Sequence, residues 1–122
     1  MNPGPALPSI DVVEADRRLR EDPDRPLLVD VRELNEFVDV RAPGAVLVPM
    51  SSFAARAGEL PKDRPLLVVC HLGGRSAAAT GFLLRSGWSN VVNVTGGMDA
   101  WERGGLPVRR GTPEPGEGDL PG

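Results

Sequence analysis

The sequence predicts an α/β fold in which helices cover both faces of a central parallel sheet. Short apolar runs rich in leucine and valine alternate along the chain with segments of helical pattern. The runs are apolar at successive positions, as in strands that are buried on both faces. The 122 residues suit one domain with a single core.

Four of the apolar runs are expected to be strands. They cover residues 27–31, 45–48, 66–69 and 91–94. A proline directly precedes the first and third runs, and another follows the second. Proline has no N–H to donate to a sheet, so these positions mark the limits of the strands.

The segments between these runs predict helices. Asp11 is placed to cap a first helix, whose apolar face is Val12, Ala15 and Leu19 and which ends before Pro23. The further helical segments are residues 33–38, a short helix that Ser51 or Ser52 caps and that ends at Ala57, residues 76–85 with Gly87 just beyond the end, and residues 98–103.

Both ends of the chain differ in composition from the rest. Residues 1–8 carry three prolines and a glycine, and residues 111–122 are almost entirely Pro, Gly, Glu and Asp. Such segments bury too little apolar surface to offset the entropy lost on ordering. We therefore expect flexible tails over residues 1–8 and 110–122, and a folded domain over residues 9–109.

Composition also limits the partners and the location. The net charge is −3 and no long run of basic residues occurs, with Arg109-Arg110 a pair only, so nucleic acid is not an expected partner. The longest apolar runs fall far short of the ~18 residues of a membrane span, and the first residues lack a signal-peptide pattern. A single cysteine argues against a disulfide scaffold and favours the cytoplasm.

Cys70 is the main candidate for chemistry. It follows the apolar run 66–69 and precedes a segment with two adjacent glycines and a helix. Active sites of parallel sheets lie at the carboxyl ends of strands, where backbone N–H groups and a helix N-terminus stabilise an anion such as a thiolate. Asp30 and Arg32, at the end of another predicted strand, are expected at the same edge.

Other interpretations of these residues remain open. Cys70 alone is compatible with a small buried hydrophobic residue. His71, the only histidine, suggests a Cys–His pair, although adjacent loop residues seldom face each other. Arg75 is a part of the site, a surface charge or an ion-pair partner of Asp30. The glycine-rich turn matches neither a dinucleotide fingerprint nor a Walker loop, which needs Gly-Lys-Ser/Thr.

Four segments in order resemble a single rhodanese domain: LLVDVRE (27–33), APGAVLVP (42–49), LLVVCHLGGRSAAA (66–79) and VTGGMDAWERGGLPV (94–108). The resemblance implies a five-stranded parallel sheet and a six-residue active-site loop, residues 70–75, that begins with a persulfide-forming cysteine. By position, Cys70 is the catalytic residue and Asp30 and Arg32 support the loop. The expected substrate-binding residues are His71, Leu72, Gly73, Gly74, Arg75 and Ser76.

The sequence departs from the family pattern at two places. Val40, Arg41 and Ala42 stand where many members have Gly-His-Ile, and His71 stands where many bacterial members have arginine. A neutral imidazole attracts an anionic donor such as thiosulfate less strongly than a guanidinium does. These departures leave the nucleophile in place and affect the donor.

The resemblance implies a sulfurtransferase that moves a sulfane sulfur from a donor such as thiosulfate to a thiol or cyanide through a persulfide. The partners are then a small anionic sulfur donor and a small-molecule or protein thiol, and neither a metal nor a cofactor is needed. One alternative is a non-catalytic rhodanese-like interaction or regulatory module. The other is a cysteine-dependent phosphatase or arsenate reductase, but those enzymes place five residues between cysteine and arginine, whereas this loop has four.

Overall fold

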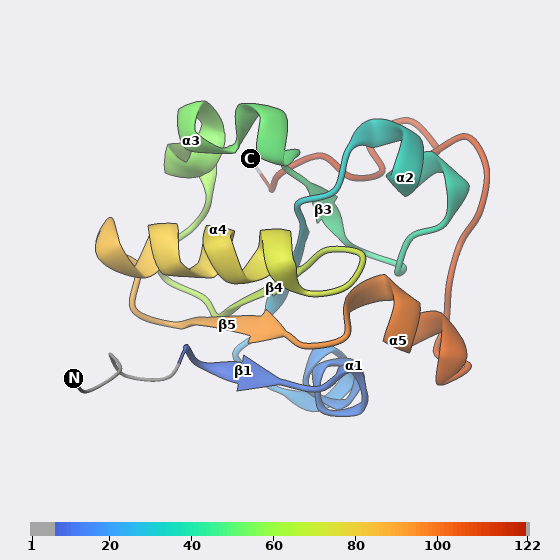
Figure 1. The fold of residues 1–122 in the computed structure, drawn as a ribbon, viewed down its shortest axis with the longest axis horizontal. Helices are drawn as coiled ribbons and strands as arrows, with labels where there is room; N and C mark the ends of the chain where they lie inside the picture. Colours follow the sequence, from blue (N-terminus) through green and yellow to red (C-terminus); the bar gives the residue numbers. More distant parts are fainter. Residues whose placement is uncertain (1–6, 122) are drawn as a thin grey trace.

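A five-stranded sheet forms the centre of the computed structural model, which describes residues 7–121 (Figure 1). The strands pair in the order β1-β5-β4-β2-β3, and every pairing is parallel. The strands are β1 (Ser9–Ile10), β2 (Leu27–Asp30), β3 (Val46–Leu47), β4 (Leu66–Val69) and β5 (Val91–Val94). The expected α/β fold with a five-stranded parallel sheet is confirmed, and β4 lies in the middle of the sheet.

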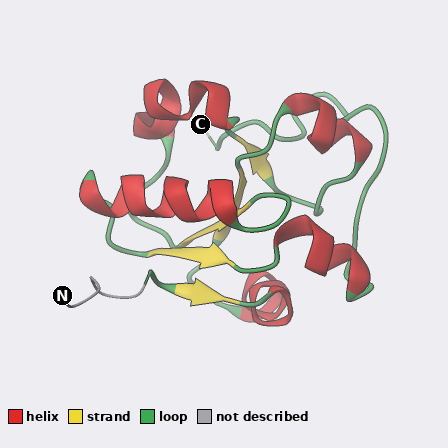
Figure 2. Cartoon of the chain, viewed as in Figure 1, coloured by secondary structure: helices red, strands yellow, loops and turns green. Residues whose placement is uncertain are grey.

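Helices connect the strands, as Figure 2 shows. They are α1 (Val12–Glu21), α2 (Leu34–Asp39), α3 (Phe53–Arg56), α4 (Gly74–Arg85) and α5 (Gly97–Arg103), with 3₁₀ turns η1 (Met50–Ser52) and η2 (Ala57–Glu59) on either side of α3. No helix within residues 7–121 is both long and apolar enough to cross a membrane.

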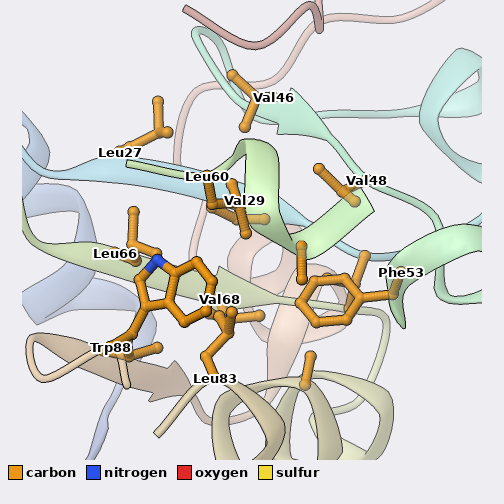
Figure 3. Packing of buried hydrophobic residues seen from close by; sticks show 14 of the residues in the cluster. Leu27, Val29, Val46, Val48, Phe53, Leu60, Leu66, Val68, Leu83 and Trp88 are labelled. Atoms are coloured by element: carbon orange, nitrogen blue, oxygen red, sulfur yellow. The ribbon is translucent and has the colours of Figure 1, made fainter. Parts of the chain in front are cut away.

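The strands bury side chains on both faces of the sheet. Val29 and Val68 pack with Phe53, Leu83 and Trp88 on the face covered by α3 and α4 (Figure 3). The intervening strand residues point the other way. The second cluster brings together Leu28, Leu67 and Val69 with residues of the remaining helices, among them Ala15, Phe37, Met98 and Trp101. Two buried faces explain why these strands are apolar at successive positions.

Most element boundaries agree with the sequence pattern. Asp11 caps α1 by accepting the Glu14 N–H at 2.8 Å, as expected. The strands β4 and β5 have the expected limits, and α4 begins two residues earlier than expected because Gly73, at φ +118°, turns the chain into the helix. The two-residue β1 was not predicted from the residue pattern, since its support is backbone pairing with β5.

The carboxyl end differs from the sequence expectation of a flexible tail over residues 110–122. Arg41, only 2% exposed, pairs with Glu117 and donates to the Gly111 carbonyl at 2.7 Å. Backbone hydrogen bonds join Gly111 to Val38 and Gly118 to Leu47. Composition gave no sign of this, because the segment docks through one buried arginine and backbone groups and not through an apolar face of its own.

The same segment packs by close contact as well. Gly118 lies so near the Phe37 ring that an added Cβ would be 3.1 Å from it, and Leu120 contacts the core on the α3 face. Figure 1 shows the segment passing from α5 around α2 towards β3. At the amino end, residues 1–6 lie outside the described residues, while the Pro8 carbonyl accepts the Asn93 N–H at 2.8 Å.

Deleting residues 111–122 should therefore destabilise the domain. We expect the free energy of unfolding to fall by at least about 1 kcal/mol, from the lost apolar contacts of Leu120 and the lost backbone hydrogen bonds alone. Urea unfolding measures the change. Deleting only residues 121–122 leaves the described contacts in place and is the matched control; equal midpoints for the two truncations would contradict the docking.

Candidate active site

Cys70 lies at the carboxyl end of the central strand and directly before the loop that leads to α4. Its side chain is 1% exposed and belongs to the cluster on the α3–α4 face. A hollow of about 260 Å³ opens beside it, lined by Cys70, His71, Leu72, Gly74 and Arg75. The residues expected to bind substrate therefore lie together at the carboxyl edge of the sheet.

Hydrogen-bond donors converge on the Cys70 sulfur. The Gly73 N–H donates to Sγ at 3.0 Å, and the Ser76 hydroxyl lies 3.3 Å from it. Burial by itself raises the pKa of the Cys70 thiol, but the Ser76 hydroxyl and the N–H groups of Ser76, Gly73 and Leu72 outweigh burial, and the pKa is lowered. The loop thus favours the thiolate, which is the nucleophilic form.

The N-terminus of α5 fixes the other side of this loop. The Met98 N–H donates to the Cys70 carbonyl at 2.8 Å, and the Asp99 N–H donates to the His71 carbonyl at 3.0 Å. This requires close approach by Gly97, where an added Cβ would lie 2.4 Å from the His71 oxygen and 2.5 Å from the Cys70 oxygen. Gly97 was not among the predicted site residues; its sequence signal is the Gly96-Gly97 pair, one residue after β5, the strand beside β4.

Asp30 and Arg32 form a buried ion pair between the end of β2 and α2. Both are buried, and the Arg32 Nη2 lies 2.8 Å from the Asp30 carboxylate. The same Nη2 donates to the Val40 carbonyl at 2.6 Å, and Nη1 donates to the Glu36 carbonyl at 3.3 Å. This buried pair therefore ties the end of β2 to the last turn of α2.

Arg75 pairs with Glu36 of α2. Its Nη1 and Nη2 lie 2.7 and 2.9 Å from the two carboxylate oxygens of Glu36. Arg75 holds the pKa of the Glu36 carboxyl down at about 2, with a smaller contribution from the Glu33 N–H. The alternative that Arg75 is an ion-pair partner of Asp30 is replaced by this pair, because the Asp30 carboxylate is bound to Arg32. Glu36 was not among the predicted site residues, because 39 positions separate it from Arg75 in the sequence.

His71 and Leu72 are exposed at the mouth of the hollow, and Leu72 is 65% exposed. Among residues 7–121, the groups that hydrogen-bond to Sγ come from Leu72, Gly73 and Ser76. Within that range, the His71 side chain makes no hydrogen bond to Cys70. The Cys–His interpretation therefore has no support from hydrogen bonding. His71 takes part in the loop through its carbonyl.

Comparison with known proteins places this arrangement in a family. The model of the rhodanese-like domain matches residues 11–103. A sulfurtransferase of Allochromatium vinosum is 38% identical over 99 residues, which are 81% of this chain and 92% of that protein. Thiosulfate sulfurtransferase GlpE of Actinobacillus succinogenes is 35% identical over 82 residues, 67% of this chain and 74% of that protein.

A solved structure agrees with this match. The crystal structure of a rhodanese-related protein from Thermoplasma volcanium has a TM-score of 0.77 and 30% identity, and the match covers 84% of this chain and 98% of that one. The chain belongs to the rhodanese family, and the relatives above place it among proteins named sulfurtransferases.

Replacing Ser76 should weaken the stabilisation of the thiolate. Ser76→Ala removes the hydroxyl beside Sγ, so we expect the pKa of Cys70 to rise and the thiolate fraction at neutral pH to fall. The pH dependence of alkylation by iodoacetamide should shift to higher pH. Thr80→Val is the control, because the Thr80 hydroxyl donates to the Ser76 carbonyl and not to the sulfur. Equal midpoints for Ser76→Ala and the unchanged protein would contradict the assignment.

Replacing Gly97 should displace the active-site loop. Gly97 has φ +57° and two backbone oxygens within 2.5 Å of an added Cβ, so Gly97→Ala should lower the free energy of unfolding by at least about 2 kcal/mol. Gly105→Ala is the control, because Gly105 has φ +67° with open space around it. We expect about 1 kcal/mol there, from backbone strain alone. Similar urea midpoints for the two variants would show that the close approach of Gly97 to the Cys70 and His71 carbonyls does not affect stability.

Proposed function

We propose that this protein is a sulfurtransferase that carries a sulfane sulfur on Cys70 as a persulfide. The observation that carries the proposal is the set of N–H and hydroxyl groups around Sγ, which lowers the pKa of a buried thiol at the edge of the sheet where substrates bind. The similarity to the Allochromatium vinosum sulfurtransferase and to thiosulfate sulfurtransferase GlpE supports the same activity.

The reaction proceeds in two transfers. The Cys70 thiolate attacks the outer sulfur of a donor such as thiosulfate; a bond forms between the two sulfurs, the sulfur–sulfur bond of the donor breaks, and sulfite leaves with the electron pair. A thiolate or cyanide acceptor then attacks the outer sulfur of the persulfide, and Cys70 leaves again as the thiolate. Neither transfer requires an external oxidant or reductant.

The loop residues have different roles in this scheme. Leu72, Gly73 and Ser76 hold the thiolate through hydrogen bonds to Sγ. Gly74, His71 and Arg75 line the approach. Asp30 and Arg32 act as positioning residues through α2. A free thiol with a lowered pKa persists in a reducing compartment, so we place the protein in the cytoplasm.

The two alternative functions receive less support. A non-catalytic module of this fold has no need for a thiol whose pKa is lowered by three loop residues. A phosphatase or arsenate reductase needs its loop arginine to face the bound oxyanion, whereas here both Nη atoms of Arg75 are bound to Glu36.

Incubation with thiosulfate tests the proposal directly. Intact-protein mass spectrometry should show one added sulfur atom, which cyanide then removes. Cys70→Ser should take up no sulfur and should lose thiosulfate:cyanide transfer, because a hydroxyl is far less nucleophilic than a thiolate at neutral pH. The circular dichroism spectrum should be unchanged. Sulfur uptake by the serine variant, or no uptake by the unchanged protein from any sulfane donor, would refute the mechanism.

A further inference from the structure

Both arginines around the mouth of the site are already paired with carboxylates. Arg75, in the hollow beside Cys70, is bound through both Nη atoms to Glu36. A second hollow shares His71 with the first, and its lining includes Arg32, Glu36, Asp39 and Glu102. Arg32 is bound to Asp30, and Glu102 is bound to Arg110.

The balance of charge at this mouth is therefore not positive. With histidine counted as neutral, the lining of the two hollows holds two arginines and three acidic residues, and both arginines are bound to carboxylates. Thiosulfate carries two negative charges, and a dianion gains little from a neutral ion pair. Among residues 7–121, neither arginine that lines the mouth is free to attract such a donor.

The nucleophile does not depend on that missing charge. The largest contributions that lower the pKa of Cys70 come from the Ser76 hydroxyl and from N–H groups of the loop, all of them dipoles. Glu36 can therefore hold the Arg75 guanidinium without removing the stabilisation of the thiolate. Formation of the thiolate thus depends mainly on the loop dipoles, whereas attraction of the donor depends on the charges at the mouth.

An apolar side chain stands at the same mouth. Leu72 lines the hollow and, at 65%, is the most exposed of the three exposed large hydrophobic residues within residues 7–121. A donor whose sulfur is attached to an apolar group can cover Leu72 as it reaches Sγ. The burial of that surface favours an organic donor over a small inorganic dianion.

We propose that Glu36 is a specificity-determining residue, which neutralises Arg75 and so selects sulfane donors that carry at most one negative charge. This inference rests on the sulfurtransferase function proposed above and concerns only the class of donor. For an organic persulfide, the Cys70 thiolate attacks the terminal S–H sulfur; the new bond forms as the donor sulfur–sulfur bond breaks, and the organic thiolate leaves with the electron pair. The proton stays on the transferred sulfur, so atoms and charge balance.

Two stable donors that differ by one charge test the proposal. Thiosulfate is a dianion, and methanethiosulfonate, in which a methyl group replaces one oxygen, is a monoanion that transfers its outer sulfur in the same way. Glu36→Gln removes the charge and keeps an oxygen that can accept the Glu33 N–H. We expect kcat/KM to rise roughly fivefold for thiosulfate and about twofold for methanethiosulfonate, with both gains reduced by salt.

Two further variants make the comparison specific. Glu21→Gln removes an arginine-paired carboxylate from the last turn of α1, which lies at the amino ends of the strands, away from Cys70. This variant should leave the preference between the two donors unchanged. Glu36→Asp keeps the charge but shortens the side chain. If the charge of Glu36 sets the donor preference, Glu36→Asp should have the preference of the unchanged protein. If Glu36 only positions the loop, Glu36→Asp should have the preference of Glu36→Gln.

The failure of this proposal can be distinguished from the failure of the function. Equal changes for the two donors in Glu36→Gln, gains that salt does not reduce, or a Glu36→Asp variant with the preference of Glu36→Gln would each overturn the role of Glu36. In all three cases sulfur would still be transferred through Cys70. Loss of the function itself would appear as transfer that persists in Cys70→Ser.

Discussion

The convergence of N–H groups on one sulfur is the constraint to which the rest of the site conforms. A buried thiolate is stable only if donors replace its lost hydration. Here the donors belong to a turn between β4 and α4, so the turn must be tight, and Gly73 takes a positive φ to make it so. The turn must also be kept in place, which α5 achieves by binding two of its carbonyls. Gly97 is required because no side chain fits between the two segments.

The sequence predicted those parts of the fold that depend on local patterns. Apolar runs indicated the buried strands, and capping chemistry indicated the Asp11 cap. The glycines after Cys70 indicated that it lies at a strand end. Each of these signals acts over a few residues. The expectation failed for the carboxyl segment, where the decisive contact joins Arg41 to Glu117 across 76 positions. It also missed Glu36 as the partner of Arg75. An ion pair between distant residues produces no periodic pattern in a sequence. Only the folded structure shows which arginines pair with which acidic residues.

Several contacts described above involve one short helix, α2. The α2 helix is held by Arg32 from the sheet side and contacts the carboxyl segment through Phe37. It also supplies the Glu36 carboxylate to Arg75. A six-residue helix has little stability of its own. Its position, and with it the charge presented beside Cys70, is therefore set by contacts from three separate parts of the chain.

The docked carboxyl segment has a consequence for self-association. The strand β3 forms one edge of the sheet, and Val48 directs its N–H inward to β2 while the N–H of Leu47 points outward. The Gly118 carbonyl accepts that outward N–H at 2.8 Å. An exposed strand edge invites pairing with an edge of another molecule, which is a common start of aggregation. By binding the Leu47 N–H at this edge, a segment rich in Pro, Gly, Glu and Asp opposes growth of the sheet into neighbouring copies.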